Sequence, residues 1–230
     1  MTEQSRQFVL LLGGSFNPPH IGHLRIALEC REALLPRKTL FIPAASPPHK
    51  PDARLLPFSL RAGMLRACLA DLPREWNLEV CEIENERAGP SYTVDTLAAL
   101  TQIHAGKRLV FVMGGEDYSQ LSSWRRWREL APLADIAVAP RTQYGRDSFE
   151  AATRQYWPGA ESCPVDGADE AFALPGGGRV FYLSQPLLQV SSSLLRERFV
   201  SGRSLDFLIP APGLKLLLEQ RLNALALWGS

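Results

Sequence analysis

The chain has few cysteines and no cysteine motif. Its 230 residues include four, Cys30, Cys68, Cys81 and Cys163, without a CxxC pair and without a histidine or cysteine partner at zinc-ligand spacing. This pattern argues against a zinc motif and against a disulfide framework. We therefore expect reduced thiols that serve as packing residues.

An excess of charge of one sign and a long hydrophobic run are also missing. Lysine and arginine number 25 against 24 acidic residues, a net charge of +1, so no global field attracts nucleic acid or an anionic membrane. The apolar run 8–12 is too short to span a membrane, and the polar residues 1–7 carry no signal-peptide pattern. We expect a soluble, cytoplasmic protein without nucleic-acid or membrane partners, whose anion site is local.

Short apolar runs and helical patterns alternate along the chain. Hydrophobic residues make up 46% of it, enough for one sizeable core, so a single domain over residues 1–230 is expected. Strands are expected near 8–12, 39–43, 78–83, 108–113, 135–139 and 179–183, and helices near 21–35, 57–72, 93–104, 122–130 and from 192. The alternation predicts an α/β fold with a Rossmann-like, doubly wound parallel sheet.

Two segments depart from this alternation. Residues 141–178 are rich in glycine, proline and acids, which predicts a long variable excursion with one helix near 149–155. Residues 190–230 are expected to form a C-terminal helical segment. Within it, 214–225 carries an apolar face with a polar face that is not strongly basic, which favours a docked helix over a membrane-surface one.

The strongest chemical signal follows the first expected strand, in the segment Gly13-Gly14-Ser15-Phe16-Asn17-Pro18-Pro19-His20-Ile21-Gly22-His23. In parallel α/β sheets, ligands bind at the carboxyl ends of strands, beside helix N-termini whose free N–H groups attract phosphate. His20 and His23 lie three residues apart and share one helical turn. A single histidine there is more often a capping or core residue, but the pair, the glycines and the strand-to-helix position together indicate phosphate chemistry.

This segment resembles the phosphate-binding signature of the HxGH nucleotidylyltransferase superfamily, and most closely that of the bacterial nicotinate mononucleotide adenylyltransferases. The letters of 20–23 also spell the HIGH signature of class I aminoacyl-tRNA synthetases. Segments 47–50 (PPHK) and 89–96 (GPSYTVDT) resemble the adenylyltransferases and not the synthetases. Segments 111–124, 190–196 (VSSSLLR) and 204–217 extend the resemblance, in the family's order, to the C-terminal helix.

The resemblance implies transfer of AMP from ATP to nicotinate mononucleotide, which gives nicotinate adenine dinucleotide and pyrophosphate in NAD biosynthesis. It implies catalytic roles for His20, His23 and Arg196. The residues it assigns to ATP are Gly13, Gly14, Ser15, Phe16, His20, His23, Ser191, Ser192, Ser193 and Arg196. Taken alone, the serines are typical of a helix N-cap run and Arg196 of a solvated side chain.

A second set is expected to bind the mononucleotide: Asn17, Lys50, Tyr92, Thr93, Glu116, Asp117 and Trp124. In the family, Trp124 lies beside the nicotinate ring, although core packing is the usual role of such a tryptophan. The family's GxD aspartate falls on Glu116, with Asp117 next to it, and the sequence leaves open which of them serves. Asn17 replaces the usual aspartate, and Lys50 is equally compatible with a phosphate contact and a solvated loop.

The chemistry accounts for these residue types. A phosphate monoester with a second pKa of about 6 is anionic at neutral pH, so it attacks the α-phosphorus without a general base. Donors placed around the phosphates then lower the barrier. Mg²⁺ is expected to arrive with ATP, without dedicated protein ligands.

Other functions remain open at this point. A pantetheine-phosphate adenylyltransferase or a cytidylyltransferase would share the first motif but lack the PSYT segment and the downstream tryptophan. A synthetase-like fragment would need a basic tRNA-binding appendage. A nucleotide sensor without activity is a further alternative, and the sequence leaves a homo-oligomer open.

Overall fold

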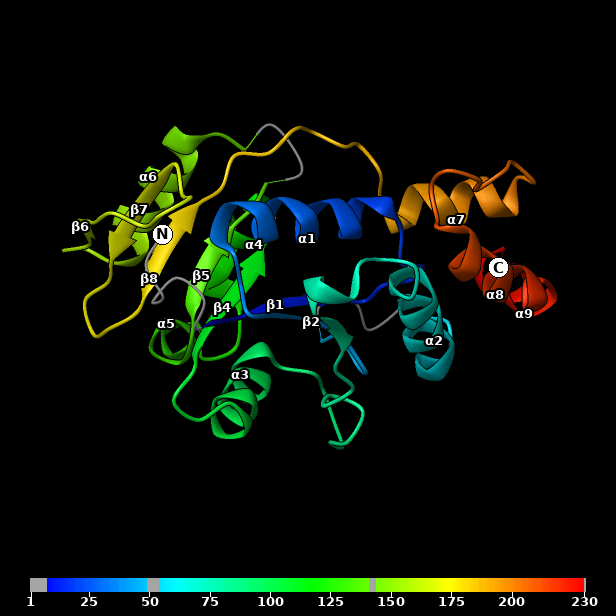
Figure 1. The fold of residues 1–230 in the computed structure, drawn as a ribbon, viewed down its shortest axis with the longest axis horizontal. Coiled ribbons are helices and arrows are strands. Elements are labelled where there is room, and N and C mark those ends of the chain that lie inside the picture. Colours follow the sequence, from blue (N-terminus) through cyan, green and yellow to red (C-terminus); the bar gives the residue numbers. More distant parts are fainter. Residues whose placement is uncertain (1–7, 49–53, 141–143, 230) are drawn as a thin grey trace. The chain divides into compact units, whose positions relative to one another are not determined.

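The computed structural model describes residues 8–48, 54–140 and 144–229 (Figure 1). Strands and helices alternate over most of the chain, which confirms the predicted α/β class. The strands are β1 Phe8–Gly14, β2 Lys38–Pro43, β3 Leu78–Val80, β4 Arg108–Met113, β5 Asp135–Val138, β6 Glu161–Ser162, β7 Glu170–Ala173 and β8 Arg179–Tyr182. The α-helices are α1 Ile21–Leu34, α2 Phe58–Leu69, α3 Thr93–Ile103, α4 Gly115–Ser119, α5 Leu130–Leu133, α6 Arg146–Tyr156, α7 Ser192–Val200, α8 Ala211–Glu219 and α9 Arg221–Trp228. Three 3₁₀ turns are η2 Arg74–Trp76, η3 Leu121–Ser123 and η4 Trp127–Glu129.

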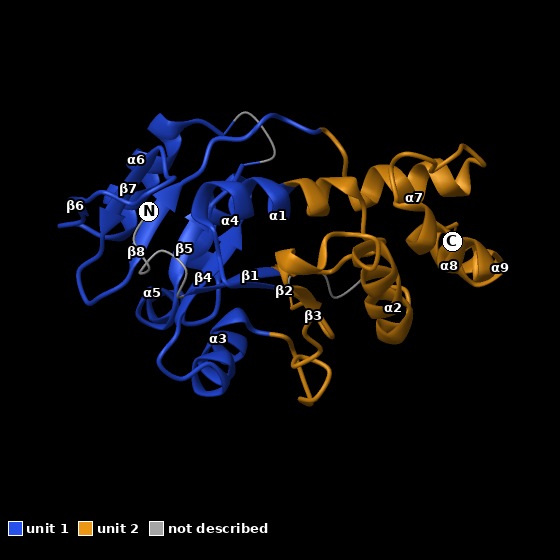
Figure 2. Ribbon diagram, viewed as in Figure 1, with its two compact units in different colours: residues 1–12, 26–39, 92–188 blue, residues 13–25, 40–91, 189–230 orange. Residues whose placement is uncertain are grey.

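The chain forms two compact units (Figure 2). Unit 1 consists of residues 1–12, 26–39 and 92–188, and unit 2 of residues 13–25, 40–91 and 189–230. Each unit is therefore assembled from three separate segments, and β1, α1 and β2 each run from one unit into the other. The expectation of one domain over residues 1–230 stays a prediction.

Unit 1 contains a sheet with the strand order β1-β4-β5-β8-β7-β6. The first four strands are parallel, with Leu10 opposite Val110 and Phe111 opposite Ile136. Parallel strands need crossovers, and Figure 1 shows α1 and α3 on opposite faces of β1 and β4. This arrangement confirms the Rossmann-like prediction for the parallel part of the sheet.

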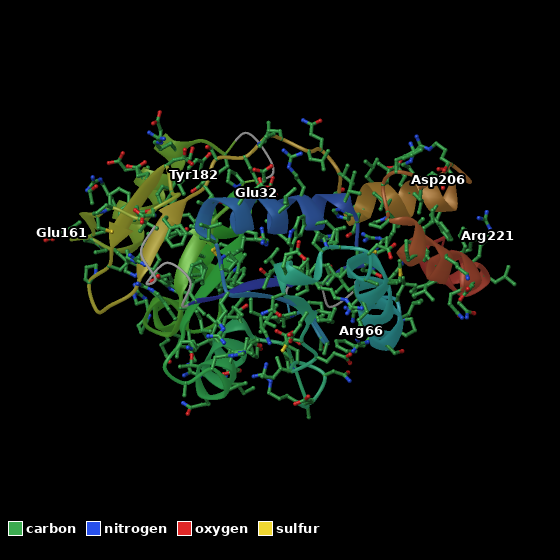
Figure 3. The ribbon with its side chains drawn as sticks, viewed as in Figure 1. Glu32, Arg66, Glu161, Tyr182, Asp206 and Arg221 are labelled. Atoms are coloured by element: carbon green, nitrogen blue, oxygen red, sulfur yellow. The ribbon has the colours of Figure 1, made fainter. Side chains whose placement is uncertain are left out.

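Over its described residues, 144–178, the excursion contains more regular structure than its composition suggests. Its helix is confirmed as α6, but β6 and β7 were not expected: β7 pairs antiparallel with β8, and β6 pairs antiparallel with β7. Gly178, with a φ of 81°, turns the chain from β7 into β8, and a Cβ there would lie 2.0 Å from the carbonyl oxygen of Ala131. Tyr182 on β8, labelled in Figure 3, donates its hydroxyl to the carbonyl of Tyr144 at 2.9 Å.

The helix expected over 122–130 was wrong. The chain instead forms α4, the turns η3 and η4, and the short α5. Arg126 has a φ of 51°, which a continuous α-helix cannot contain, and its guanidinium donates to both carboxylate oxygens of Glu129, at 2.9 and 2.6 Å. This break exposes Arg126 while it buries the neighbouring Trp127.

Unit 2 packs α2, α7, α8 and α9 around a shared apolar cluster. The buried members are Leu56, Met64, Cys68, Leu195, Phe199, Leu205, Ile209, Leu214, Leu217, Ala224 and Trp228. The helices α2 and α8 contact each other closely, because a Cβ at Gly213 would lie 2.3 Å from the sulfur of Cys68. The expected single helix 214–225 was wrong: α8 ends at Glu219 and α9 begins at Arg221, so that both helices bury side chains in the cluster.

Two smaller expectations can be compared with the structure. The strand expected at 78–83 ends at Val80. Cys30 and Cys68 are buried free thiols, and burial raises the pKa of each to about 12. This confirms them as packing residues of low reactivity. Across the described ranges no helix combines the length and the apolar character that a membrane crossing requires.

Candidate active site

The first motif lies entirely in unit 2, in the turn between β1 and α1. Gly14 ends the strand, and its carbonyl accepts a 2.8 Å hydrogen bond from the N–H of Ala44, which follows β2. Phe16 is buried with a φ of 45°, a left-handed conformation that non-glycine residues seldom adopt. Backbone of this kind concentrates at ligand sites, where the surrounding structure enforces it.

The rings of both histidines cap backbone N–H groups at the start of α1. Nδ1 of His20 accepts a hydrogen bond from the N–H of Gly22 at 3.1 Å, and Nδ1 of His23 accepts one from the N–H of His20 at 3.2 Å. In a capping box, the side chain before the helix and that of the third helical residue each accept from the other's N–H. Here the His23 ring makes its half of that pattern, whereas the His20 ring accepts from Gly22 instead. Imidazoles here take the places that serine and glutamate usually occupy.

This cap fixes the hydrogen positions on both rings. A ring nitrogen that accepts a hydrogen bond carries no hydrogen, so the neutral ring of His20 and that of His23 each carry it on Nε2. The ring centroids are 3.8 Å apart, which places the rings side by side. The capping role and a phosphate-binding role are therefore compatible, because the cap presents each Nε2–H as the donor.

Small and aromatic neighbours hold this pair in place. A Cβ at Gly22 would lie 2.9 Å from the His20 ring and 3.2 Å from the carbonyl oxygen of Val190, so this position requires glycine. The ring of Phe16 packs against His23, with centroids 4.7 Å apart. A Cβ at Gly14 would lie 3.3 Å from the same Phe16 ring.

The second motif in unit 2 is joined to the first by hydrogen bonds. Arg196 on α7 donates from Nη1 to the carbonyl of Asn17 at 2.8 Å and from Nη2 to the hydroxyl of Ser193 at 3.0 Å. Ser192 donates to the carbonyl of Pro18 at 2.9 Å. The structure thus brings Arg196 to Asn17, three places before His20, although Arg196 and Asn17 are 179 positions apart in sequence.

The serines and Arg196 also have local roles. The hydroxyl of Ser191 accepts a 3.2 Å hydrogen bond from the N–H of Leu194, so this serine caps α7. Arg196 is half-buried, and burial lowers its guanidinium pKa, although an arginine stays charged. Five N–H groups on a rigid fork leave donors for a phosphate after the two hydrogen bonds described above.

The side chain of Asn17 binds backbone. Its Oδ1 accepts from the N–H of Leu56 and its Nδ2 donates to the carbonyl of Arg54, both at 2.9 Å. Only an amide can do both, which gives a physical reason for asparagine where the resembled family usually has aspartate. Its expected role in mononucleotide binding stays a prediction.

Arg61 is a residue that the sequence reasoning missed. It is 1% exposed on α2, with Nε donating to the carbonyl of Leu56 at 2.9 Å. Its Nη1 donates to the carbonyls of Ser15 and Ala44 at 2.7 and 2.8 Å. A signal was present, since Arg61 shares the i, i+3, i+4 and i+7 stripe of α2 with Met64, Leu65 and Cys68, all of them apolar and buried.

Unit 1 holds most of the residues expected to bind the mononucleotide. Tyr92 directly precedes α3 and Thr93 begins it, where the helix leaves backbone N–H groups unpaired by its own carbonyls. The guanidinium of Arg125 lies 4.6 Å from the centroid of the Tyr92 ring. A positive charge therefore lies next to the start of α3.

The other expected residues of unit 1 lie on the stretch that follows β4. Trp124 is half-buried at the end of η3, and its ring meets that of Phe111 edge-on at 6.3 Å between centroids. Glu116 and Asp117 are both exposed in the first turn of α4, so the structure brings both carboxylates to the turn after β4. Lys50 lies outside the described residues.

Metal ligands do not cluster in the part of the chain that the structure covers. Among those residues, no group of three or more histidine, cysteine, aspartate and glutamate side chains could hold an ion. The phosphate-binding candidates of unit 2 are imidazole, guanidinium, hydroxyl and backbone N–H groups. This donor set suits an anion, whereas Mg²⁺ prefers carboxylate and water oxygens.

Comparison with known proteins agrees with this description. The cytidylyltransferase-like family model matches residues 11–198. A protein of Trichlorobacter lovleyi named "Probable nicotinate-nucleotide adenylyltransferase" is 38% identical over 211 residues, covering 92% of this chain and 96% of that protein. A protein of Geobacter metallireducens with the same name is 36% identical over 213 residues, with the same two coverages.

A solved structure shows the same fold at low identity. It is the Plasmodium falciparum nicotinic acid mononucleotide adenylyltransferase complexed with NaAD, with a TM-score of 0.73, 15% identity and coverage of 94% of this chain and 97% of that one. The family match begins within β1 and ends within α7, and the relatives match over nearly their whole length. The chain therefore belongs to the cytidylyltransferase-like family and, within it, to the nicotinate-nucleotide adenylyltransferases.

Proposed function

We propose that this chain transfers the adenylyl group of ATP to nicotinate mononucleotide, giving nicotinate adenine dinucleotide and pyrophosphate. The observation that carries this proposal is the pair of histidine caps at the β1–α1 turn, which place the hydrogen of each neutral ring on Nε2, together with Arg196 bound to the same turn. The relatives match nearly the whole chain, and the substrates in this proposal are taken from their names.

The reaction needs charge stabilisation more than proton transfer. An oxygen of the mononucleotide 5′-phosphate forms a bond to the α-phosphorus, and the bond from that phosphorus to the bridging oxygen of the β-phosphate breaks. Both electrons of the broken bond leave with pyrophosphate. His20 and His23 donate hydrogen bonds to the phosphate oxygens on which negative charge grows, and Arg196 holds the departing phosphates.

Backbone and serine donors complete the phosphate site. Gly13, Gly14, Ser15 and Phe16 supply backbone N–H groups in the β1–α1 turn. Ser191 caps α7 and Ser192 and Ser193 begin it, a position where backbone N–H groups favour binding of an anion. Mg²⁺ enters as part of the substrate, bound to the oxygens of ATP and to water, because the donor set of this unit does not suit a protein-held Mg²⁺.

Residues of unit 1 bind the pyridine and ribose parts of the mononucleotide, and two residues of unit 2 bind its phosphate. Trp124 stacks on the pyridine ring, and the start of α3 at Tyr92 and Thr93 receives the carboxylate. Support comes from Arg125, whose charge lies over the Tyr92 ring and favours an anionic group there. Glu116 or Asp117 binds ribose hydroxyls, Asn17 lies close to the acceptor phosphate, and Lys50 contacts it.

We expect the acid mononucleotide to be preferred over the amide form. Backbone N–H groups are donors only, so the amide's NH₂ leaves one of them unpaired, at a cost of about 1–3 kcal/mol. That corresponds to roughly 10- to 100-fold in kcat/KM. Because the reaction consumes ATP, the proposed compartment is the cytoplasm. A homo-oligomer is a separate possibility, which light scattering would test.

One acceptor comparison tests the proposal. The full chain is given ATP and Mg²⁺ with nicotinate mononucleotide, nicotinamide mononucleotide or phosphopantetheine, and pyrophosphate release is measured. The proposal expects turnover with nicotinate mononucleotide, at a higher kcat/KM than with the amide. Turnover with phosphopantetheine alone, or with none of the three, would overturn it.

A further inference from the structure

Arg61 connects three segments of unit 2 through backbone carbonyls. It reaches Ser15 in the β1–α1 turn, Ala44 directly after β2, and Leu56 before α2. At 1% exposure it is a buried cation, and Glu84, the acid that acts on it through space, only partly offsets the burial that lowers its pKa. Burying a guanidinium is costly unless its N–H groups are hydrogen-bonded. The three backbone carbonyls that accept from Arg61 meet this requirement.

The bond to Ser15 controls the direction of the next N–H group. The carbonyl of Ser15 and the N–H of Phe16 belong to one peptide plane, and in a trans peptide they point in opposite directions. Because Nη1 of Arg61 holds this carbonyl at 2.7 Å on the buried side, the N–H of Phe16 points to the other side. The left-handed φ of 45° at Phe16 shows that this peptide has an unusual orientation, which needs support from its surroundings.

The same guanidinium nitrogen fixes a second segment. Nη1 also holds the carbonyl of Ala44, and the N–H of Ala44 donates to the carbonyl of Gly14. The chain after β2 is thereby tied to the β1–α1 turn at two points. A rotation of the Ser15–Phe16 peptide would break at least one of these hydrogen bonds.

We propose that Arg61 is a positioning residue of the phosphate site, which orients the Ser15–Phe16 peptide so that the N–H of Phe16 faces the phosphates of ATP. This inference rests on the proposed function for the identity of the ligand. Arg61 itself does not touch the substrate. Its effect passes through one peptide unit, and it requires the geometry of the guanidinium fork in addition to its charge.

Arg61→Lys tests this requirement, since lysine keeps the charge but replaces a rigid fork by a single ammonium. The probes are ATP, inorganic tripolyphosphate and nicotinate mononucleotide, titrated separately by calorimetry. We expect Kd for ATP and for tripolyphosphate to rise by about 10- to 100-fold, the range for losing one hydrogen bond to a charged group. Kd for the mononucleotide should change less than about twofold.

Arg198→Lys is the matched control. Arg198, also in unit 2, holds a backbone carbonyl with two donors, Nε and Nη2 to Ser204 at 3.1 and 2.8 Å. This variant should lower the melting temperature without changing any of the three Kd values. If Arg61→Lys behaves like Arg198→Lys, Arg61 is a stabilising residue only and the proposal is wrong.

A measurement on the unchanged protein covers the case in which Arg61→Lys fails to fold. Protein labelled with ¹⁵N at phenylalanine is titrated with tripolyphosphate, and the Phe16 amide should show the largest shift among the phenylalanine amides. An unshifted Phe16 amide would overturn the proposal. The failure of the proposed function looks different, because wild-type protein would then bind tripolyphosphate through Phe16 but release no pyrophosphate with nicotinate mononucleotide.

Discussion

The phosphate candidates of unit 2 and the pyridine candidates of unit 1 are held in different ways. In unit 2, His20, His23 and Arg196 are each fixed by hydrogen bonds to backbone within one turn. In unit 1, Trp124 and Tyr92 are half-buried and are held by ring contacts, next to short helices and turns. Polyphosphate is common to every reaction of this kind, so its site can be rigid, whereas side-chain contacts are easily changed to suit a different acceptor.

The largest effect is expected at the histidine cap. His23→Ala should lower kcat by roughly 10²-fold or more with a smaller change in ATP affinity, because Nε2–H stabilises transition-state charge. His23→Asn separates the two roles, since its amide oxygen can still accept from the N–H of His20 but no donor reaches the Nε2 position. It should be as inactive as His23→Ala and more stable, as steady-state kinetics and thermal melts would show. Unchanged kcat in either folded variant would remove His23 from the mechanism.

Trp124 tests the pyridine-binding residues of unit 1. Trp124→Ala should weaken binding of nicotinate mononucleotide by about 1–3 kcal/mol, the value of stacking on one ring, and leave ATP binding nearly unchanged. Trp124→Phe should recover most of the loss. Titrations that show equal losses for both ligands would identify Trp124 as a packing residue and remove the contrast between the units at this position.

Asn17 tests whether unit 2 is held by its backbone contacts. Asn17→Asp restores the residue usual in the resembled family, but it removes the donor to Arg54 and places a carboxylate against that carbonyl. We expect a loss of about 1–3 kcal/mol in the free energy of unfolding, measured by urea denaturation. Asn17→Ser removes the amide group without adding a charge and serves as the comparison. A more stable Asn17→Asp variant would show that the amide contacts are unimportant.

The smallest effect concerns the acid preference in unit 1. Arg125→Gln removes the charge over the Tyr92 ring, and an exposed charge contributes at most about 1 kcal/mol, so the ratio of kcat/KM values for acid and amide should fall by up to about fivefold. Arg128→Gln, which removes a cation from Trp127, is the control and should leave the ratio unchanged. An unchanged ratio in Arg125→Gln would leave the preference to the backbone of α3 alone.

Periodicity predicted the parallel strands and most helices because those elements bury one face or both. It failed where a single residue decides the backbone: Arg126 takes a left-handed φ inside an expected helix, and Gln220 separates α8 from α9. The strands β6 and β7 were missed because they are short, with little apolar alternation. Pairing in the sheet, β7 with β8 and β6 with β7, stabilises strands that their own sequence does not predict.

The predicted phosphate residues of unit 2 lie together in the structure. The sequence could predict this because the resembled family has the same two motifs in the same order, one at a strand-to-helix turn and one at the start of a second helix. The capping role of the two Nδ1 atoms could not be predicted from the sequence, because their hydrogen-bond partners depend on the backbone of the turn. The sequence reasoning also missed Arg61, since a lone arginine on a helix usually faces solvent. Only its place on an apolar stripe hinted at burial.

Isotope transfer tests the central claim most directly. The wild-type chain is given nicotinate mononucleotide, Mg²⁺ and ATP labelled with ³²P at the α-phosphate in one reaction and at the γ-phosphate in another, and the products are separated chromatographically. Adenylyl transfer predicts that the α-label appears in nicotinate adenine dinucleotide and the γ-label in pyrophosphate. A γ-label in the nucleotide product, or an α-label released only as AMP, would contradict the account.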